Sequence, residues 1–424
     1  MLVTANGTLC ICTGRDRARL PYFGSRLSEQ EHVLRTSFPL LRRDKQVSLP
    51  SRLLPSGAPK ALSRSMIFKN VYEIQHTNHT TLYSMEGLRG LAILLVFLVH
   101  YVTLSEPWIS ESVRTHYWAS LVRSLGNVGV DLFFVLSGYL IYGMLLKKQR
   151  PFIPYLRRRI ERIYPTFGAV LALYILLSVL FPAKSKIPHN AADAALYVAE
   201  NLLLLPGVFD IDPIITVAWS LSYELFFYLS VPFLVFFLQL RRWTSTGRFA
   251  FFFLVAALIL ALPQFVGGHV RLAMFISGML VFEVSTHGRL PVRMEFLGFL
   301  GLVLGLACTV AQYTYGFSGQ WKFATLALSF FLLCWTCFSL DGPTSRAFRW
   351  TPLRWLGNIS YSYYLIHGLV LNAIFFLLPK LVAPTGNDLY VFTLGLPACF
   401  LATFLVATLL FLSVEKPFSL SKIT

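Results

Sequence analysis

Ten long apolar blocks recur along the 424-residue chain and constrain its fold more than any other feature. Each block covers about 17–25 residues, the length that an α-helix needs to cross a lipid bilayer. Hydrophobic residues make up 55% of the sequence and charged residues only 13%, a composition typical of integral membrane proteins rather than of soluble domains. We therefore predict an all-α, polytopic integral membrane protein with about ten transmembrane helices. The predicted spans cover approximately residues 87–104, 126–146, 161–182, 216–240, 248–265, 268–285, 295–314, 322–340, 354–379 and 390–413.

A shorter apolar stretch at 194–209 is not predicted to span the membrane. It carries Glu200 and ends at Pro206–Gly207, and this pair interrupts a helix. We expect the stretch to lie at the membrane interface or to re-enter the bilayer.

The net charge of +17 indicates membrane orientation and not a nucleic-acid partner, because the charge is distributed by loop. Residues 1–65 hold eleven Lys/Arg and four Asp/Glu, and the 147–162 connection holds seven Lys/Arg and one Glu. Connections with this cationic excess alternate with neutral or acidic ones such as 183–215. Since cytoplasmic loops carry the Lys/Arg excess, we expect both termini in the cytoplasm, and ten spans satisfy this parity.

The six cysteines show no disulfide framework. Cys334 and Cys337 form a C-x-x-C, but the pair sits in an apolar span with no histidine nearby. We interpret them as packing residues, with metal or redox work as the alternative, and predict no metal site.

Two ionisable residues bracket the first span in the stretch MEGLRGLAILLVFLVH, residues 85–100. Arg89 and His100 are eleven positions apart, so an α-helix places them on one face, about 16 Å apart along the axis. Polar groups inside a span usually face a protein interior or a water-filled cavity and are functional. His100 is the only side chain of this span that titrates near neutral pH. It is a candidate general base for an acceptor hydroxyl that attacks a thioester, and packing against a neighbouring helix is the alternative.

The polar motifs of the spans occur in a specific order. They are EGLRG with His100, GNVGVDLFFVLSGYLI at 126–141, RRRIERIYP at 157–165, AWSLSYELFFYLSVP at 218–232, RLAMFISG at 271–278, LGNISYSYYLIH at 356–367 and VEKP at 414–417. Together they resemble the membrane-bound acyltransferase-3 family of bacterial O-acyltransferases, from about residue 84 to 417. The histidine that matches His100 is regarded as catalytic in that family.

The resemblance implies an O-acyltransferase of the bacterial inner membrane. Such an enzyme moves an acyl group, here expected to be acetyl, from acyl-CoA to a hydroxyl of a cell-envelope carbohydrate or glycolipid. Acyl-CoA would be a co-substrate, and no bound cofactor is expected. We accordingly divide the chain into a poorly structured basic arm at 1–84, an acyltransferase-3-like membrane domain at 85–417 and a cytoplasmic tail at 418–424, with Met66 and Met85 as alternative translation starts.

Two carboxylates at a depth similar to that of His100 are candidates for the same site. We expect Asp131 to orient His100 and Glu224 to lie on the substrate side, because an unpaired carboxylate within a span is costly. A structural hydrogen bond or interhelical pair is the alternative for either group. Trp219 and Tyr223 add hydrogen-bonding groups around Glu224 and are candidate substrate-binding residues.

A cluster of arginines marks the expected cytoplasmic end of the third span. Arg159 and Arg162 are three positions apart, share a helix face and match the R-x-x-R of the resembled family. Guanidinium groups bind phosphate oxygens in a bidentate manner, so these residues, with Arg89, are candidates to bind the phosphates of coenzyme A. For the neighbouring Arg157 and Arg158, a role in topology and lipid-headgroup contact is the favoured interpretation.

Several other polar residues remain open to two interpretations. Arg271 is a candidate to contact an acceptor sugar, and extension of its side chain to the membrane interface is the alternative. Ser137 is an alternative nucleophile, although close helix packing is favoured. For His367 and the tyrosines before it, packing is favoured over sugar binding. The motif at 415–417 is interpreted as a cytoplasmic helix stop.

Two other classes of function compete with the acyltransferase. A transporter of an acylated sugar or small anion would use Arg89, His100 and Glu224 as a relay, and would show ion dependence without covalent transfer. A receptor-like or structural membrane protein would tolerate the simultaneous loss of His100 and Arg89.

Overall fold

The computed structural model describes residues 71–73, 83–110, 112–262, 269–286, 291–316, 319–384, 386 and 388–420. The chain divides into two units, Met1–Ala61 and Leu62–Thr424, and all of the described residues belong to the second. Most of the predicted N-terminal arm and the last four residues of the predicted tail therefore lie outside the described residues.

The described part of the chain is helical, and eight of its helical segments are long and apolar enough to cross a membrane. These segments are Tyr83–Trp108, Val113–Lys147, Phe152–Leu180, Thr216–Phe237, Arg293–Tyr315, Gly319–Ser339, Ser360–Lys380 and Tyr390–Leu420. The two other predicted spans, 248–265 and 268–285, coincide with the shorter apolar helices Ser245–Ala261 and Leu272–Ser285. The prediction of a polytopic all-α membrane protein is confirmed, and the predicted number of about ten spans is close.

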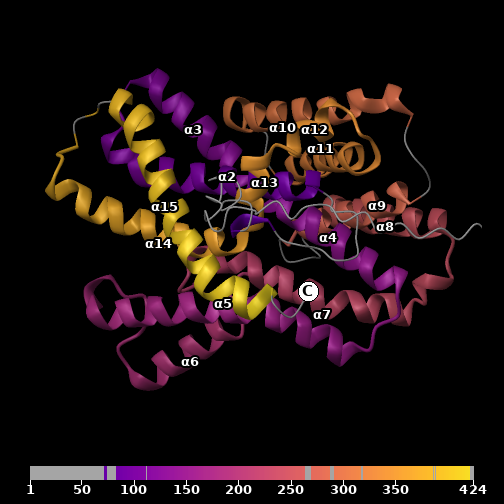
Figure 1. Ribbon diagram of the computed structural model, residues 1–424, viewed down its shortest axis with the longest axis horizontal. Helices are drawn as coiled ribbons and strands as arrows, with labels where there is room; N and C mark the ends of the chain where they lie inside the picture. The colour runs from indigo at the N-terminus through magenta and orange to yellow at the C-terminus, as the bar shows by residue number, and fades with distance from the viewer. Residues whose placement is uncertain are drawn as a thin grey trace, which may run out of the picture. The chain divides into compact units, whose positions relative to one another are not determined.

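The helices follow one another along the chain as Figure 1 shows. Their bounds are α2 (Tyr83–Ser105), α3 (Val113–Asn127), α4 (Gly129–Lys147), α5 (Phe152–Leu180), α6 (Ala191–Leu202), α7 (Trp219–Phe237), α8 (Ser245–Ala261), α9 (Leu272–Ser285), α10 (Phe296–Tyr315), α11 (Gly319–Ser339), α12 (Pro343–Phe348), α13 (Thr351–Asn358), α14 (Ser360–Leu377) and α15 (Leu396–Leu410). Two π-helical segments, Tyr390–Gly395 and Phe411–Leu420, extend α15 at its two ends.

Three features differ from the predicted spans or refine them. Helix α3 is a 15-residue helix that the sequence did not predict, because its mixed polar and apolar residues lack the long apolar run of a span. The predicted span 354–379 is divided into α13 and α14. Helix α6 is only 12 residues long, as expected for a stretch that does not span the membrane.

Close helix contacts depend on glycines that face a neighbouring backbone. A Cβ placed on Gly138 of α4 would lie 2.0 Å from the Phe275 carbonyl oxygen of α9, and a Cβ on Gly278 would lie 1.9 Å from the Val135 carbonyl oxygen. Small residues allow helices in a membrane to approach closely, where van der Waals contact replaces the hydrophobic effect as the source of stability. These two glycines therefore fix how α4 and α9 pack together.

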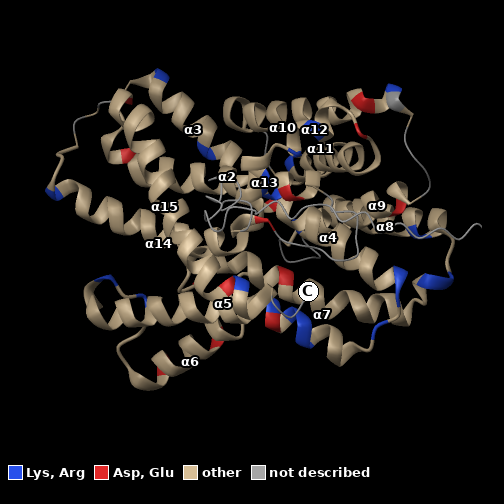
Figure 2. Ribbon diagram, in the orientation of Figure 1, with Lys and Arg blue, Asp and Glu red and all other residues tan. Residues whose placement is uncertain are grey.

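Helix α2, which bears Arg89 and His100, packs against α3, α4, α13 and α14. An ion-pair network anchors its first turn: Arg354 of α13 donates to Glu86 at 2.8 Å and to Glu73 at 2.9 Å. Figure 2 shows that most charged residues lie at helix ends and that a few lie within the bundle near α5 and α13. The anchored α2 thus places Arg89 and His100 on a helix that four other helices contact.

Candidate active site

His100 lies on α2 beside His367 of α14. The centroids of the two imidazole rings are 5.0 Å apart, and the ring planes make an angle of 62°. His100 is half-buried, whereas the side chain of His367 is fully buried. The structure therefore places His100, a predicted catalytic residue, next to His367, for which packing was the favoured interpretation.

A cavity of about 220 Å³ opens beside His100. Helices α2, α5 and α14 and the segment before α7 contribute its lining: His100, Thr103, Leu104, Tyr174, Thr216, Val217, Leu365, Gly368 and Asn372. Three hydroxyl groups and one amide thus surround the space next to the imidazole. These groups can donate hydrogen bonds to, and accept them from, a hydroxyl-rich ligand.

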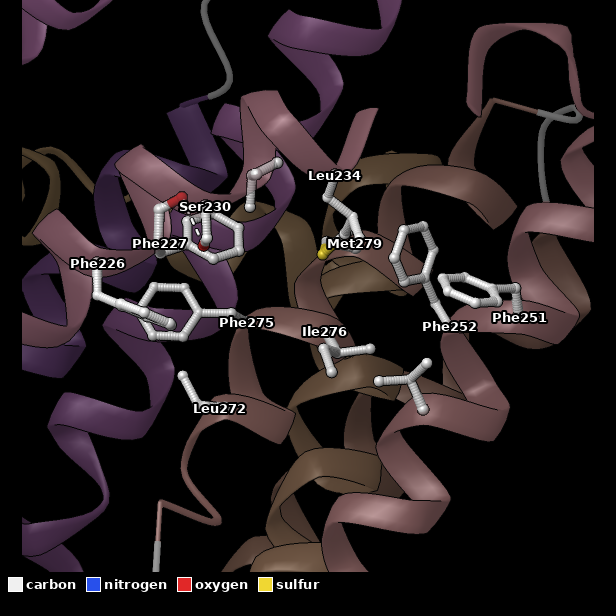
Figure 3. A pocket seen from close by; sticks show the side chains of 12 residues that line it. Phe226, Phe227, Ser230, Leu234, Phe251, Phe252, Leu272, Phe275, Ile276 and Met279 are labelled. Carbon is white, nitrogen blue, oxygen red and sulfur yellow. Dashed lines mark hydrogen bonds between the residues drawn. The ribbon is translucent and has the colours of Figure 1, made fainter. Parts of the chain in front are cut away.

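A second, apolar groove of about 160 Å³ lies between α7, α8 and α9 (Figure 3). Phenylalanines dominate its lining, and the hydroxyl of Ser230 donates to the Phe227 carbonyl oxygen. Among the residues that the structure describes, no titratable side chain lines this groove, so acid–base chemistry is assigned to the cavity beside His100.

Arg89 lies on the same continuous helix as His100, eleven positions closer to its start, as the sequence analysis requires. Its guanidinium donates from Nε and Nη2 to the Ser360 hydroxyl oxygen at 3.3 and 3.0 Å. The charges of Arg162, Glu415 and Glu224 all act on it electrostatically. We call the three arginines predicted to bind the donor, Arg89, Arg159 and Arg162, the cationic layer.

Arg162 is engaged by a buried carboxylate. Its Nη1 donates to Glu415 Oε1 at 2.7 Å, and the Glu415 side chain is fully buried. The other oxygen of Glu415 accepts hydrogen bonds from the backbone N–H and the hydroxyl of Ser362, at 3.0 and 2.5 Å. The interpretation of residues 415–417 as a helix stop is wrong, because the helical segment continues through Pro417 to Leu420 and places Glu415 inside the bundle.

Arg159 has a different environment from Arg162. Its guanidinium lies 5.7 Å from the ring centroids of both Tyr155 and Tyr228, and its Nη2 lies 3.7 Å from the Met144 sulfur. Its Nε is buried and has no hydrogen-bond partner among the described residues. A buried, unpaired donor on a cation is costly unless a ligand pairs with it, so Arg159 retains capacity to bind an anion.

Glu224 is the centre of a hydrogen-bond network between α4 and α7. It accepts hydrogen bonds from the Ser137 hydroxyl at 2.9 Å and from the Tyr228 hydroxyl. Tyr228 also contacts Arg159, so the network connects the carboxylate with the arginine cluster of α5. The structure places Ser137 as a hydrogen-bond donor to Glu224.

Asp131 pairs with Arg271 and not, as we expected, with His100. The Arg271 Nε lies 3.3 Å from Asp131 Oδ1, and the Asp131 side chain is 1% exposed. Helix α4 begins two residues before Asp131, and its contact with α9 brings the carboxylate to Arg271 at the start of α9. A guanidinium at this distance offsets part of the cost of burying the carboxylate.

The three residues predicted to bind the acceptor form one aromatic cluster around this ion pair. The Arg271 guanidinium lies 4.8 Å from the Trp219 ring centroid, and the Trp219 and Tyr223 rings meet at right angles, 6.0 Å apart. The Tyr223 hydroxyl is 2.5 Å from His269 Nδ1. None of these residues is among those that line the cavity beside His100. The structure thus separates the predicted acceptor residues from the cavity next to the candidate base.

Possible metal ligands do not gather into groups of three or more within the described ranges. Cys334 and Cys337 are buried free thiols in α11.

Sequence reasoning missed three contacts of this site: His367 with His100, Ser360 with Arg89, and Glu415 with Arg162. His367 and Ser360 both belong to the motif at 356–367, and Glu415 belongs to VEKP, so the motifs themselves were the available signal. The sequence did not show which of these distant segments contact one another.

Comparison with known proteins identifies the family. The sequence profile described as "Acyltransferase domain", that of the acyltransferase-3 family, matches residues 82–412. YrhL of Bacillus subtilis, a proposed peptidoglycan O-acetyltransferase, is 25% identical over an alignment of 335 residues that covers 70% of this chain and 49% of YrhL. The peptidoglycan O-acetyltransferase OatA of Listeria monocytogenes is 25% identical over an alignment of 371 residues that covers 79% of this chain and 55% of OatA. The O-acetyltransferase OatA of Staphylococcus aureus is 26% identical over 190 residues, 42% of this chain and 28% of that protein.

The chain therefore spans about half the length of the first two relatives. No solved structure matches it. Because the family profile covers most of the chain and the fold is that of a polytopic helical membrane protein, the protein belongs to the acyltransferase-3 family.

Proposed function

We propose that the protein is a membrane O-acetyltransferase that moves an acetyl group from acetyl-CoA to a hydroxyl of a cell-envelope carbohydrate. The relatives named as peptidoglycan O-acetyltransferases support the carbohydrate acceptor. The single observation that supports the chemistry best is the arrangement along α2. One helix carries a histidine beside a hydroxyl-lined cavity and, eleven positions earlier, an arginine within a cationic layer.

The cationic layer is the proposed binding region for coenzyme A. Arg89 is hydrogen-bonded to a neutral hydroxyl, and Arg159 has a buried N–H without a partner among the described residues. Both can therefore bind the phosphates of the donor. Arg162 is already neutralised by Glu415, so we assign it a role in shaping the layer. The extended pantetheine arm would reach from the arginines toward His100, about 16 Å along the helix.

The proposed reaction is a direct transfer. A nitrogen lone pair of His100 takes the proton of the acceptor hydroxyl while the hydroxyl oxygen forms a bond with the thioester carbonyl carbon. The tetrahedral intermediate then breaks its carbon–sulfur bond. The departing thiolate takes the proton from the His100 imidazolium, so the products are the acetyl ester and coenzyme A with a free thiol.

The proposed location is the bacterial inner membrane, with both termini in the cytoplasm. The alternation of cationic and acidic connections supports this orientation. It would place Arg89 toward cytoplasmic acetyl-CoA and His100 toward an acceptor outside the cytoplasm. Donor and acceptor would thus reach the site from opposite sides.

The test measures label transferred from radiolabelled acetyl-CoA to peptidoglycan fragments, together with the release of free coenzyme A thiol, in membranes that contain the full chain. The intact protein is compared at equal abundance with His100→Ala and with His189→Ala, whose histidine lies in an exposed connection. General-base catalysis contributes about 10²–10⁴-fold, so the first variant should fall to near background and the second should match the intact protein.

Equal transfer by His100→Ala and the intact protein would remove His100 as the base. No label and no thiol release by the intact protein would contradict acetyl transfer itself.

A further inference from the structure

The tautomer of His367 follows from its hydrogen bonds. Its Nδ1 lies 3.0 Å from the Tyr363 carbonyl oxygen and 2.8 Å from the Tyr364 carbonyl oxygen. Because a carbonyl oxygen can only accept, Nδ1 carries the hydrogen. In the neutral imidazole, Nε2 is then an acceptor with a lone pair.

This Nε2 acceptor is buried and has no hydrogen-bond partner among the residues that the structure describes. His367 itself is fully buried in α14. Burial of an unpaired polar atom is costly, and such atoms in a native protein require an explanation. Here the neighbouring ring of His100, 5.0 Å away and edge-on, suggests the missing partner.

A general-base histidine needs an acceptor for its own N–H. That acceptor fixes the tautomer, so that the other ring nitrogen offers its lone pair to the substrate hydroxyl. A carboxylate usually has this role, but the two candidate carboxylates are engaged elsewhere. Asp131 pairs with Arg271, and Glu224 accepts from Ser137 and Tyr228.

We infer that His367 is the positioning residue of His100: its Nε2 accepts a hydrogen bond from the N–H of His100, so that the other nitrogen of His100 faces the acceptor hydroxyl in the cavity. This inference rests on the proposed role of His100 as the general base. A modest rotation of the rings closes the contact when substrate is bound, since catalytic hydrogen bonds tighten in the reactive complex.

His367 remains neutral throughout the transfer. When His100 takes the proton of the acceptor hydroxyl, its ring becomes an imidazolium, and its N–H becomes a stronger donor to His367 Nε2. The carbonyl oxygens of Tyr363 and Tyr364 hold the Nδ1 hydrogen in place. The proton on His100 then leaves with the coenzyme A thiolate, so no net proton stays on either histidine.

Two substitutions separate this role from a structural one. In His367→Asn, the side-chain amide can replace the Nδ1–H donor to the backbone carbonyls, but no acceptor remains at the Nε2 position. In His367→Gln, the longer side chain can place its carbonyl oxygen near the Nε2 position. The matched control is the same pair of substitutions at His189, an exposed histidine that does not line the cavity.

We expect His367→Asn to lower kcat by about 10²-fold with the KM for acetyl-CoA unchanged, because the base is misplaced while donor binding is intact. His367→Gln should recover at least one-tenth of the intact kcat. The measurements use membranes with the full chain, acetyl-CoA and peptidoglycan fragments, and abundance and thermal stability are determined for each variant.

A purely structural role gives the opposite order, with the Asn variant active and the Gln variant impaired. An Asn variant with the intact kcat, or a Gln variant no better than the Asn variant, overturns the inference. If only one of the two His367 variants accumulates in the membrane, its kcat alone tests the inference. The His100→Ala variant distinguishes failure of this inference from failure of the proposed function. If His100→Ala is inactive and His367→Asn is active, only the inference about His367 is rejected. If His100→Ala is fully active, His100 is not the base.

Discussion

Arg162 of α5 and Glu415 of the last helical segment form an ion pair of 2.7 Å across 253 positions of the sequence. The carboxylate is fully buried and also accepts two hydrogen bonds from Ser362. The pair therefore joins three segments: α5, the start of α14 and the end of the chain's helical region.

We expect Glu415→Ala to destabilise the protein by about 3–5 kcal/mol, because removal of one partner leaves a largely buried guanidinium without a counter-charge. Thermal unfolding of the detergent-solubilised protein measures the effect. The matched control is Arg157→Gln, which breaks an exposed i,i+4 pair with Glu161 and should change stability by no more than about 0.5 kcal/mol. Equal losses in the two variants would show that burial does not strengthen the Arg162–Glu415 pair.

Donor binding should distinguish neighbouring arginines. Arg159→Gln is expected to raise the KM for acetyl-CoA about tenfold, equivalent to about 1.4 kcal/mol, because the phosphate of the donor would lose the guanidinium whose Nε is buried without a partner among the described residues. Arg158→Gln removes the same charge from an exposed position one residue away and should leave the KM within about twofold. Equal KM values for the two variants would place the coenzyme A phosphates elsewhere.

The Asp131–Arg271 pair is expected to act on stability and not directly on His100. Asp131→Asn should lower stability, while kcat per folded molecule stays within about threefold of the intact protein, since the partner of Asp131 is Arg271 and not His100. The double variant with Arg271→Gln should be less destabilised than the sum of the two single variants, because each single change leaves its partner unpaired. Additive losses would contradict the interaction of Asp131 with Arg271. A kcat loss near that of His100→Ala would restore Asp131 as the partner of the base.

The acid stability of the protein should depend in part on Asp388. Burial acts to raise the pKa of this carboxyl group, but hydrogen bonds from Ser110 and Thr115 outweigh it and hold the pKa below its ordinary value. A carboxyl with a lowered pKa in the folded state stabilises the protein above its unfolded pKa of about 3.9. This stabilisation is lost as the pH falls through the lower folded pKa.

Asp388→Asn should therefore lower the melting temperature more at pH 6 than at pH 2, because protonation of Asp388 at low pH removes the difference in charge between the intact protein and the variant. The exposed Asp210→Asn serves as the control and should not change the pH dependence. A constant difference between Asp388→Asn and the intact protein from pH 2 to 6 would exclude ionisation of this group as the cause.

Some features of the protein follow from local sequence alone. The ten apolar blocks correspond to eight long helices and two shorter ones, because the length of an apolar run and the hydrogen bonds of its own backbone decide whether it is a helix in a membrane. The common face of Arg89 and His100 follows from helix periodicity within α2. The ordered motifs also identified the family, which the profile match over residues 82–412 confirms.

Helix α3 was not predicted from the local sequence. Its residues lack a long apolar run, so most of this helix falls between two predicted spans. Its helical form depends on neighbours that a local pattern does not contain, since α3 packs against α2 and α10.

The partners of the ionisable residues were decided only by tertiary structure. From the sequence we expected Asp131 to orient His100, interpreted residues 415–417 as a helix stop and favoured packing for His367. In the structure, Arg271, Arg162 and His100 meet Asp131, Glu415 and His367, respectively, from helices that are distant in the chain. Such pairings depend on how closely the helices approach one another. Contacts such as that of Gly138 with the Phe275 backbone set this approach. The periodicity of a single helix determines which face a side chain occupies, but only the packing of several helices determines what that face meets.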